Sequence, residues 1–60
     1  MTHTFELRLD DGVGEPRRRL LTLESAGDLI RRVRDLMGAE PGVRAVEVRL
    51  AGASLFTLPR

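Results

Sequence analysis

Few residues of this 60-residue chain belong to the types that carry out catalysis, and they are scattered. His3 is the only histidine, and no acid close to it in sequence would orient it as a general base. It also lacks neighbours at the spacing of metal ligands. Cysteine is absent, which excludes disulfides and thiolate metal sites. We therefore interpret His3 as a partly exposed residue near the chain start, and we expect no catalytic, cofactor-binding or metal-binding site.

Three carboxylates gather in one short segment, where Asp10, Asp11 and Glu15 surround two glycines. Such a group could bind a divalent cation weakly, but its spacing does not match a calcium loop. Adjacent acids beside glycine are also typical of a hairpin loop, because their side chains accept hydrogen bonds from nearby backbone amides. We favour the turn interpretation.

All ten basic residues are arginine, and six of them lie in two short runs. Arginine forks suit phosphate, so Arg31, Arg32 and Arg34 form a candidate anion-binding group. Nine acids nearly balance the ten bases, and neither tryptophan nor tyrosine is present to stack on bases. A GC-rich genome would also produce this composition. We keep weak binding of nucleic acid or a phosphate ligand as an alternative function, and interpret the arginines mainly as a solvated face.

The element that organises the chain is a predicted helix over Ser25–Gly38. Ser25 is a candidate N-cap for the amide of Asp28, and Gly38 followed by Pro41 marks the end. The apolar residues of this segment recur at helical spacing. They are Ala26, Leu29, Ile30, Val33, Leu36 and Met37. A helix of this length is marginal in water by itself, so its apolar stripe must be covered by a sheet or by another chain.

The segment before the helix reads as a β-hairpin. Thr2–Asp10 alternates between apolar and polar residues, Asp10–Pro16 is rich in turn formers, and Arg17–Leu23 forms a second strand. The matching apolar parity predicts a specific register. It pairs Phe5 with Leu23, Leu7 with Leu21, and Leu9 with Arg19.

A second hairpin is predicted after the helix. Val43–Leu50 alternates like a half-buried strand, Ala51–Ala53 suits a three-residue turn around a glycine, and Ser54–Leu58 forms the last strand. This turn pairs Val48 with Phe56 and Val46 with Leu58, and directs Leu55 outward.

The predicted fold is therefore α+β in the order ββαββ. One domain over residues 1–60 would contain a four-stranded, mainly antiparallel sheet with one helix on one face. Two strand orders fit: a β-grasp-like order with the first and last strands parallel at the centre, or a half-ferredoxin-like order with the fourth strand beside the second. The sheet residues expected in the core are Phe5, Leu7, Leu9, Leu21, Leu23, Val46, Val48, Leu50, Phe56 and Leu58.

The segment Pro41–Leu50 resembles the helix-to-strand passage of small ferredoxin-like domains, such as heavy-metal-associated or ACT-type modules. The Cys-x-x-Cys pair that binds metal in the first of these is absent. The resemblance therefore implies no metal site, and it assigns the chain to neither family.

A single helix leaves the other face of the sheet uncovered. By strand parity this face carries charged residues and two leucines, Leu20 and Leu55, that nothing covers. A small chain without disulfides commonly gains stability by oligomerisation. We therefore expect a non-enzymatic binding or assembly module that forms a homodimer, or binds a protein partner, through the open sheet face or a sheet edge. The candidate interface residues are Arg8, Arg18, Leu20, Thr22, Glu47, Arg49 and Leu55.

No apolar run approaches membrane-spanning length and the first residues lack a signal-peptide pattern, so we expect a cytoplasmic protein that does not enter a membrane. A less favoured alternative is an enzyme whose site forms between subunits, with His3 or the Asp10–Asp11 pair contributing.

Overall fold

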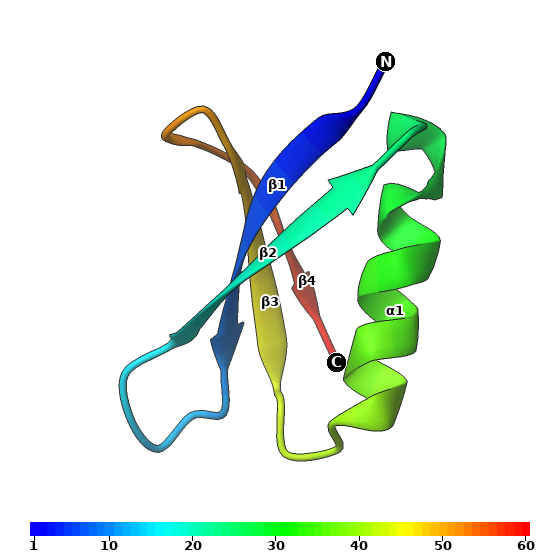
Figure 1. The fold of residues 1–60 in the computed structure, drawn as a ribbon. Coiled ribbons are helices and arrows are strands. Elements are labelled where there is room, and N and C mark those ends of the chain that lie inside the picture. The colour runs from blue at the N-terminus through cyan, green and yellow to red at the C-terminus, as the bar shows by residue number, and fades with distance from the viewer.

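The computed structural model describes all of residues 1–60 and contains one sheet and one main helix (Figure 1). The order ββαββ and the α+β class predicted from the sequence are confirmed. The elements are β1 (His3–Asp10), β2 (Arg17–Leu23), the 3-10 turn η1 (Ala26–Asp28), α1 (Leu29–Ala39), β3 (Ala45–Leu50) and β4 (Ala53–Pro59).

The four strands lie in the order β2-β1-β3-β4, and every neighbouring pair is antiparallel. Neither predicted strand order is correct, because β3 pairs with β1 at the centre of the sheet. β2 and β3 consequently run in the same direction with β1 between them, and α1 crosses over β1 to connect them. Eleven helical residues span about 16 Å, enough to return the chain along the sheet to the end where β1 finishes.

The register of the first hairpin differs from the prediction by two residues. Phe5 pairs with Leu21 and Leu7 with Arg19, so the parity was correct and the offset was wrong. The turn around Gly12, whose φ is +80°, returns the chain earlier than expected. Arg17 and Arg19 lie on the parity that faces α1 in both registers, and in the observed one both pair with Glu40.

The second hairpin confirms the pairs Val48–Phe56 and Val46–Leu58. Its turn is shorter than predicted, because Leu50 pairs with Ala53 and only Ala51 and Gly52 lie between them. Both turn residues have positive φ, 52° and 82°, as a two-residue hairpin turn requires. The register then shifts between Val48 and Arg49, which leaves Leu55 as the extra residue of a β-bulge.

The helix ends differ in detail from the prediction. The Ser25 hydroxyl accepts a hydrogen bond from the amide of Gly27 at 3.2 Å, not from that of Asp28, so it caps η1. Gly38 does not end the helix, because α1 continues to Ala39 and Gly38 has no positive φ.

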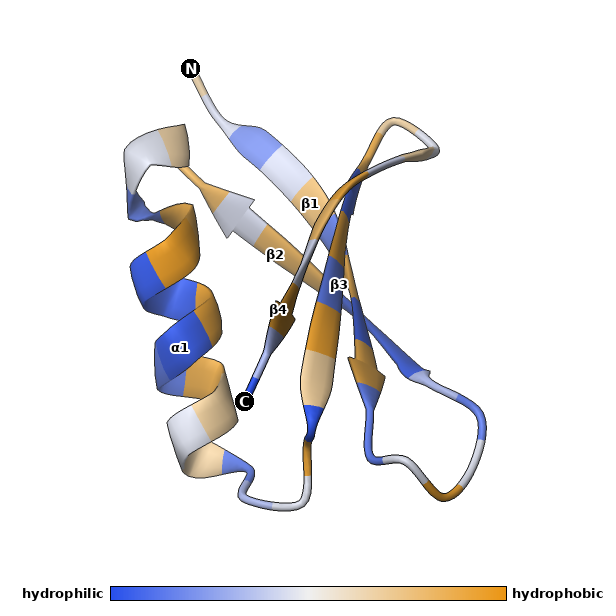
Figure 2. Cartoon of the chain, turned by 180° about the vertical axis from the view of Figure 1, so that it is seen from behind, coloured by the Kyte–Doolittle hydropathy of each residue, from blue (hydrophilic) through white to orange (hydrophobic).

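The core lies between α1 and one face of the sheet, and the hydrophobic bands of α1 face the strands (Figure 2). Ten apolar residues are buried: Phe5, Leu7, Leu9, Leu23, Leu29, Val33, Met37, Val43, Val46 and Val48. Four predicted core residues, Leu21, Leu50, Phe56 and Leu58, are only partly buried at the margin. Ile30 belongs to the predicted helix stripe but is 42% exposed, because the narrower row Leu29, Val33 and Met37 makes the contact with the sheet.

Candidate functional site

The two edges of the sheet, β2 and β4, differ in how open they are to further pairing. β4 contains the Leu55 bulge and ends at Pro59, which has no backbone N–H. Bulges and prolines are two of the devices that block edge strands. β2 has neither, and all seven of its residues keep an uninterrupted register with β1. β2 is therefore the regular edge on which another strand can add.

A groove of about 270 Å³ runs beside this edge, between β2 and α1. Its apolar lining comes from both elements and from β1 beneath them, and charged side chains lie at its rim. The lining residues are Leu7, Arg19, Leu20, Leu21, Arg32, Asp35 and Leu36. β2 pairs with β1 on one side only, so no further strand closes the outer side of this groove.

All three arginines of β2 form ion pairs with carboxylates of the chain. Glu40, just beyond α1, accepts one hydrogen bond from Arg17 at 2.9 Å and one from Arg19 at 2.7 Å through its two carboxylate oxygens. The bond from Arg17, together with the positive charge of Arg19, lowers the pKa of Glu40 below its ordinary value of 4.5. This carboxylate ties the start of β2 to the segment just after α1, and its negative charge offsets one of the two positive charges at the start of the edge.

Replacement of Glu40 by glutamine should lower the free energy of unfolding at neutral pH, and should make that free energy depend less on pH in the acidic range. The pKa of Glu40 is lowered in the folded state, so its contacts with Arg17 and Arg19 stabilise the fold above pH 4.5. This contribution is lost as the pH falls through the lower, folded-state pKa. Urea unfolding between pH 7 and pH 3 measures this. The matched control is Glu15→Gln, because Glu15 forms no ion pair. Equal pH profiles for Glu40→Gln and the unmodified chain would contradict the prediction.

The open face of the sheet, predicted as an interface, is centred on Glu6. Its carboxylate lies 3.5 Å from Arg8, 2.5 Å from Arg18 and 3.4 Å from Arg49. Because these arginines lie on β1, β2 and β3, the Glu6 carboxylate links three adjacent strands. Arg49 also approaches Glu47 at 3.5 Å. Glu6 and Arg49 keep only 22% and 23% of their side-chain surfaces exposed, so the network is partly shielded from water by its own stems.

The remaining predicted interface residues lie around this network. Thr22 shares a hydrogen bond of 3.1 Å with Thr4 of β1. Leu20 lies opposite Glu6 on one edge of the sheet, while Leu55 lies in the bulge at the other edge. The two leucines are 60% and 49% exposed, yet two strands of charged residues separate them. They do not form a single apolar patch.

The three helix arginines considered for anion binding do not converge. Arg31 pairs with Asp28 at 3.2 Å, one turn earlier on the helix. Arg32 lines the groove beside β2, and Arg34 lines a separate depression with Arg60 near β4. Two other arginines, Arg44 and Arg60, line a common depression, and no local sequence pattern indicates this because they are sixteen positions apart.

The acidic loop has the turn geometry that its composition indicates. Asp10 accepts a hydrogen bond from the amide of Gly12 at 2.8 Å, and Asp11 accepts from Val13 at 2.9 Å and Gly14 at 3.2 Å. These amides, that of Val13 foremost, lower the pKa of Asp11 below 3.8. The turn interpretation of these acids is confirmed. No group of three or more histidine, cysteine or acidic residues is arranged to hold a metal ion.

No protein-family model, no curated protein and no solved structure matches this chain. The structure contains no helix with the length and hydrophobicity needed to cross a membrane.

Proposed function

We propose that the chain is a small assembly module that forms a twofold homodimer by antiparallel pairing of β2 with β2 of a second copy. The observation that carries the proposal is the contrast between the edges: β2 is regular and borders an apolar groove, while β4 is blocked by its bulge and Pro59. Sixty residues with only ten buried side chains make a small core, and pairing would enlarge it.

A twofold axis at Leu20 gives the most favourable register. Leu20 then meets its own copy on the open face, where 60% of its surface is now exposed. The same register places Arg17 opposite Leu23, Arg18 opposite Thr22, and Arg19 opposite Leu21. No arginine of β2 faces another arginine, so this pairing avoids the like-charge contacts that destabilise neighbouring strands.

The groove supports the same symmetric arrangement. An interface around a twofold axis must be complementary to itself, so a charged residue needs its opposite on the same surface. Arg32 and Asp35 both line the groove, together with the partly buried Leu36. In the proposed dimer Arg32 approaches the partner's Asp35 on either side of the axis, while Leu36 and Leu21 cover the centre.

A single cysteine tests the register, because the chain has none of its own. Leu20→Cys should form an intermolecular disulfide rapidly under mild oxidation, since residues on the axis lie opposite their copies at a separation that a disulfide can span. Leu55→Cys is the matched control, an exposed leucine on the blocked edge. Crosslinking that is equally fast at both positions would contradict the proposed interface.

Light scattering on the eluting protein tests the assembly itself. We expect twice the chain mass of 6.7 kDa for the unmodified protein, and the single-chain mass for Leu20→Glu, because two carboxylates would meet at the axis. Leu55→Glu should stay dimeric. Circular dichroism confirms that the variants remain folded. A strict monomer at every concentration of the unmodified protein would refute the proposal.

A further inference from the structure

We propose that Glu40 is the positioning residue of the β2 dimer, because it holds the Arg19 side chain away from the twofold axis and from the same side chain of the second copy. This role rests on the dimer proposed above and deepens that proposal, since it explains how two arginine-rich edges can approach each other. Glu40 belongs neither to β2 nor to the lining of the groove, so it acts through Arg19.

The register that avoids direct arginine pairs still brings the two copies of Arg19 together diagonally. With the axis at Leu20, Arg19 lies one residue from the axis and opposite the partner's Leu21. The partner's own Arg19 is two residues before that leucine, on the same face of the sheet. Diagonal neighbours of this kind are roughly 7–8 Å apart, which long side chains can bridge. Two unrestrained guanidinium groups would therefore repel each other beside the axis.

The carboxylate of Glu40 draws Arg19 toward the start of β2. Arg19 Nη1 donates to Glu40 Oε2 at 2.7 Å, and Arg17 Nη2 donates to Oε1 at 2.9 Å. Glu40 directly follows α1, and the end of α1 lies at the end of the sheet where β2 begins (Figure 1). The carboxylate thus anchors the Arg19 guanidinium on the side of Arg17, which is the side away from Leu20.

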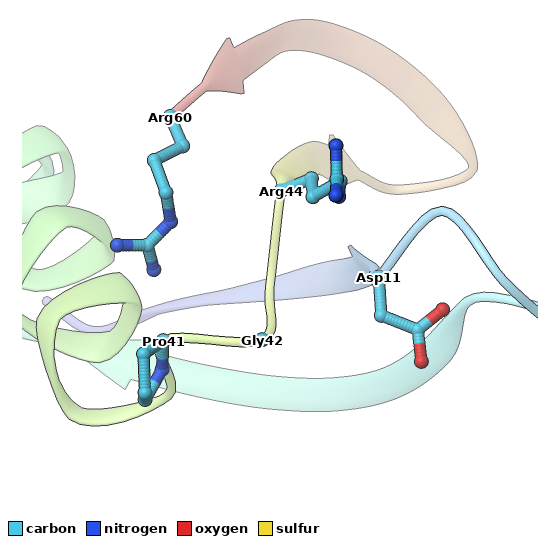
Figure 3. A pocket seen from close by; sticks show the side chains of 5 residues that line it. All are labelled: Asp11, Pro41, Gly42, Arg44 and Arg60. Carbon is cyan, nitrogen blue, oxygen red and sulfur yellow. The ribbon is translucent and has the colours of Figure 1, made fainter.

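This contact is partly shielded from water and is charged at neutral pH. Glu40 keeps only 23% of its side-chain surface exposed. The hydrogen bond from Arg17, with the positive charge of Arg19, holds the pKa of Glu40 below its usual range. Arg60 does not compete for the carboxylate, because it donates to the backbone carbonyl of Glu40 at 3.1 Å, and in Figure 3 its guanidinium is turned to the end of α1.

Glu40 also sets the charge balance on the helix side of the proposed interface. Arg32 and Asp35 line the groove, and in the dimer each approaches the opposite charge of the second copy. The two remaining arginines on this side, Arg17 and Arg19, have Glu40 as their only ion-pair partner. Without Glu40, two copies would bring four arginines that lack a carboxylate to one interface, and like charges brought together across an interface oppose association.

The test compares dimer dissociation constants, measured by sedimentation equilibrium at neutral pH on variants that circular dichroism shows to be folded. Glu40→Gln keeps an acceptor oxygen and should fold, but it should weaken the dimer about tenfold. In a chain that already carries Arg19→Gln, the same change should have little effect, because the repelling guanidinium groups are gone. In a chain that carries Arg31→Gln on the outer helix face, it should still weaken the dimer about tenfold, although the net charge is the same.

Salt separates this role from a merely structural one. Added sodium chloride should tighten the Glu40→Gln dimer, since it screens the repulsion between the two Arg19 guanidinium groups. It should not tighten the unmodified dimer, in which those groups are held apart. Glu15→Gln makes the same charge change at a residue without an ion pair, so its dissociation constant and salt dependence should match those of the unmodified chain.

Failure of the dimer and failure of the Glu40 role give different results. A strict monomer of the unmodified protein would overturn both. A dimer that Glu40→Gln leaves unchanged would overturn the role of Glu40 alone. So would a dimer that Glu40→Gln weakens equally with and without Arg19→Gln, because the loss would then not act through Arg19.

Discussion

Replacing Leu7 with alanine is expected to lower the free energy of unfolding by about 3 kcal/mol, within the range of 2–5 kcal/mol typical of buried leucines. Leu7 lies at the middle of β1, one of the two central strands, and only 1% of its surface is exposed. It pairs with Arg19 on one side and Val48 on the other, and α1 covers it. Loss of this buried side chain removes its contacts in the core and leaves a cavity.

Urea unfolding followed by circular dichroism measures this loss. Leu55→Ala removes the same atoms from an exposed position in the bulge and should cost well under about 1 kcal/mol. Because a 60-residue domain has a small margin of stability, Leu7→Ala should also lower the melting temperature by more than about 10 °C. A loss for Leu7→Ala no larger than for Leu55→Ala would show that the core is not packed as described.

The second large effect is expected for Arg60→Ala, which should cost about 2 kcal/mol. The Arg60 guanidinium binds carbonyl groups at and just beyond the end of α1, where the helix leaves its last carbonyls without partners. Hydrogen bonds from a charged donor are worth more than neutral ones, and they also join β4 to the helix end. Alanine keeps the backbone bond from residue 60 to Arg44, so the change isolates the side chain.

Arg60→Lys separates geometry from charge. Lysine keeps a positive charge near the negative end of the helix dipole, but it is a point charge without the planar fork. We expect it to recover less than half of the loss, with a weak dependence on salt. Full recovery by lysine would mean that the charge alone matters.

Pattern and turn chemistry were enough to predict the number, order and type of the elements. Alternation in β1 and β3 and the helical spacing of Leu29, Val33 and Met37 are local features, and they follow directly from the backbone periods of strand and helix. The turn role of Asp10 and Asp11 was also predictable, because the backbone amides that donate to their carboxylates lie two or three residues away. None of these needs a distant contact.

The errors occurred where two distant segments had to be placed together. The predicted register of the first hairpin was wrong by two residues, because parity restricts the offset to steps of two but does not choose among them. The end of α1 was predicted from Gly38 and Pro41, whereas carbonyls there are satisfied by Arg60, twenty or more positions away. A residue pattern near the helix contains no signal of that contact.

The sequence by itself determined the ββαββ order, the apolar parity of each strand and the acidic turn, because each depends on residues that are neighbours in the chain. Only the tertiary structure decided the strand order, the pairing of Glu40 with Arg17 and Arg19, and the binding of Arg60 to carbonyls at the end of α1. The physical reason is that side chains such as arginine fit many positions locally, and only the packing of α1 over β1 brings particular ones together. The residue types that can form ion pairs are visible in the sequence, but the fold decides which of them become partners.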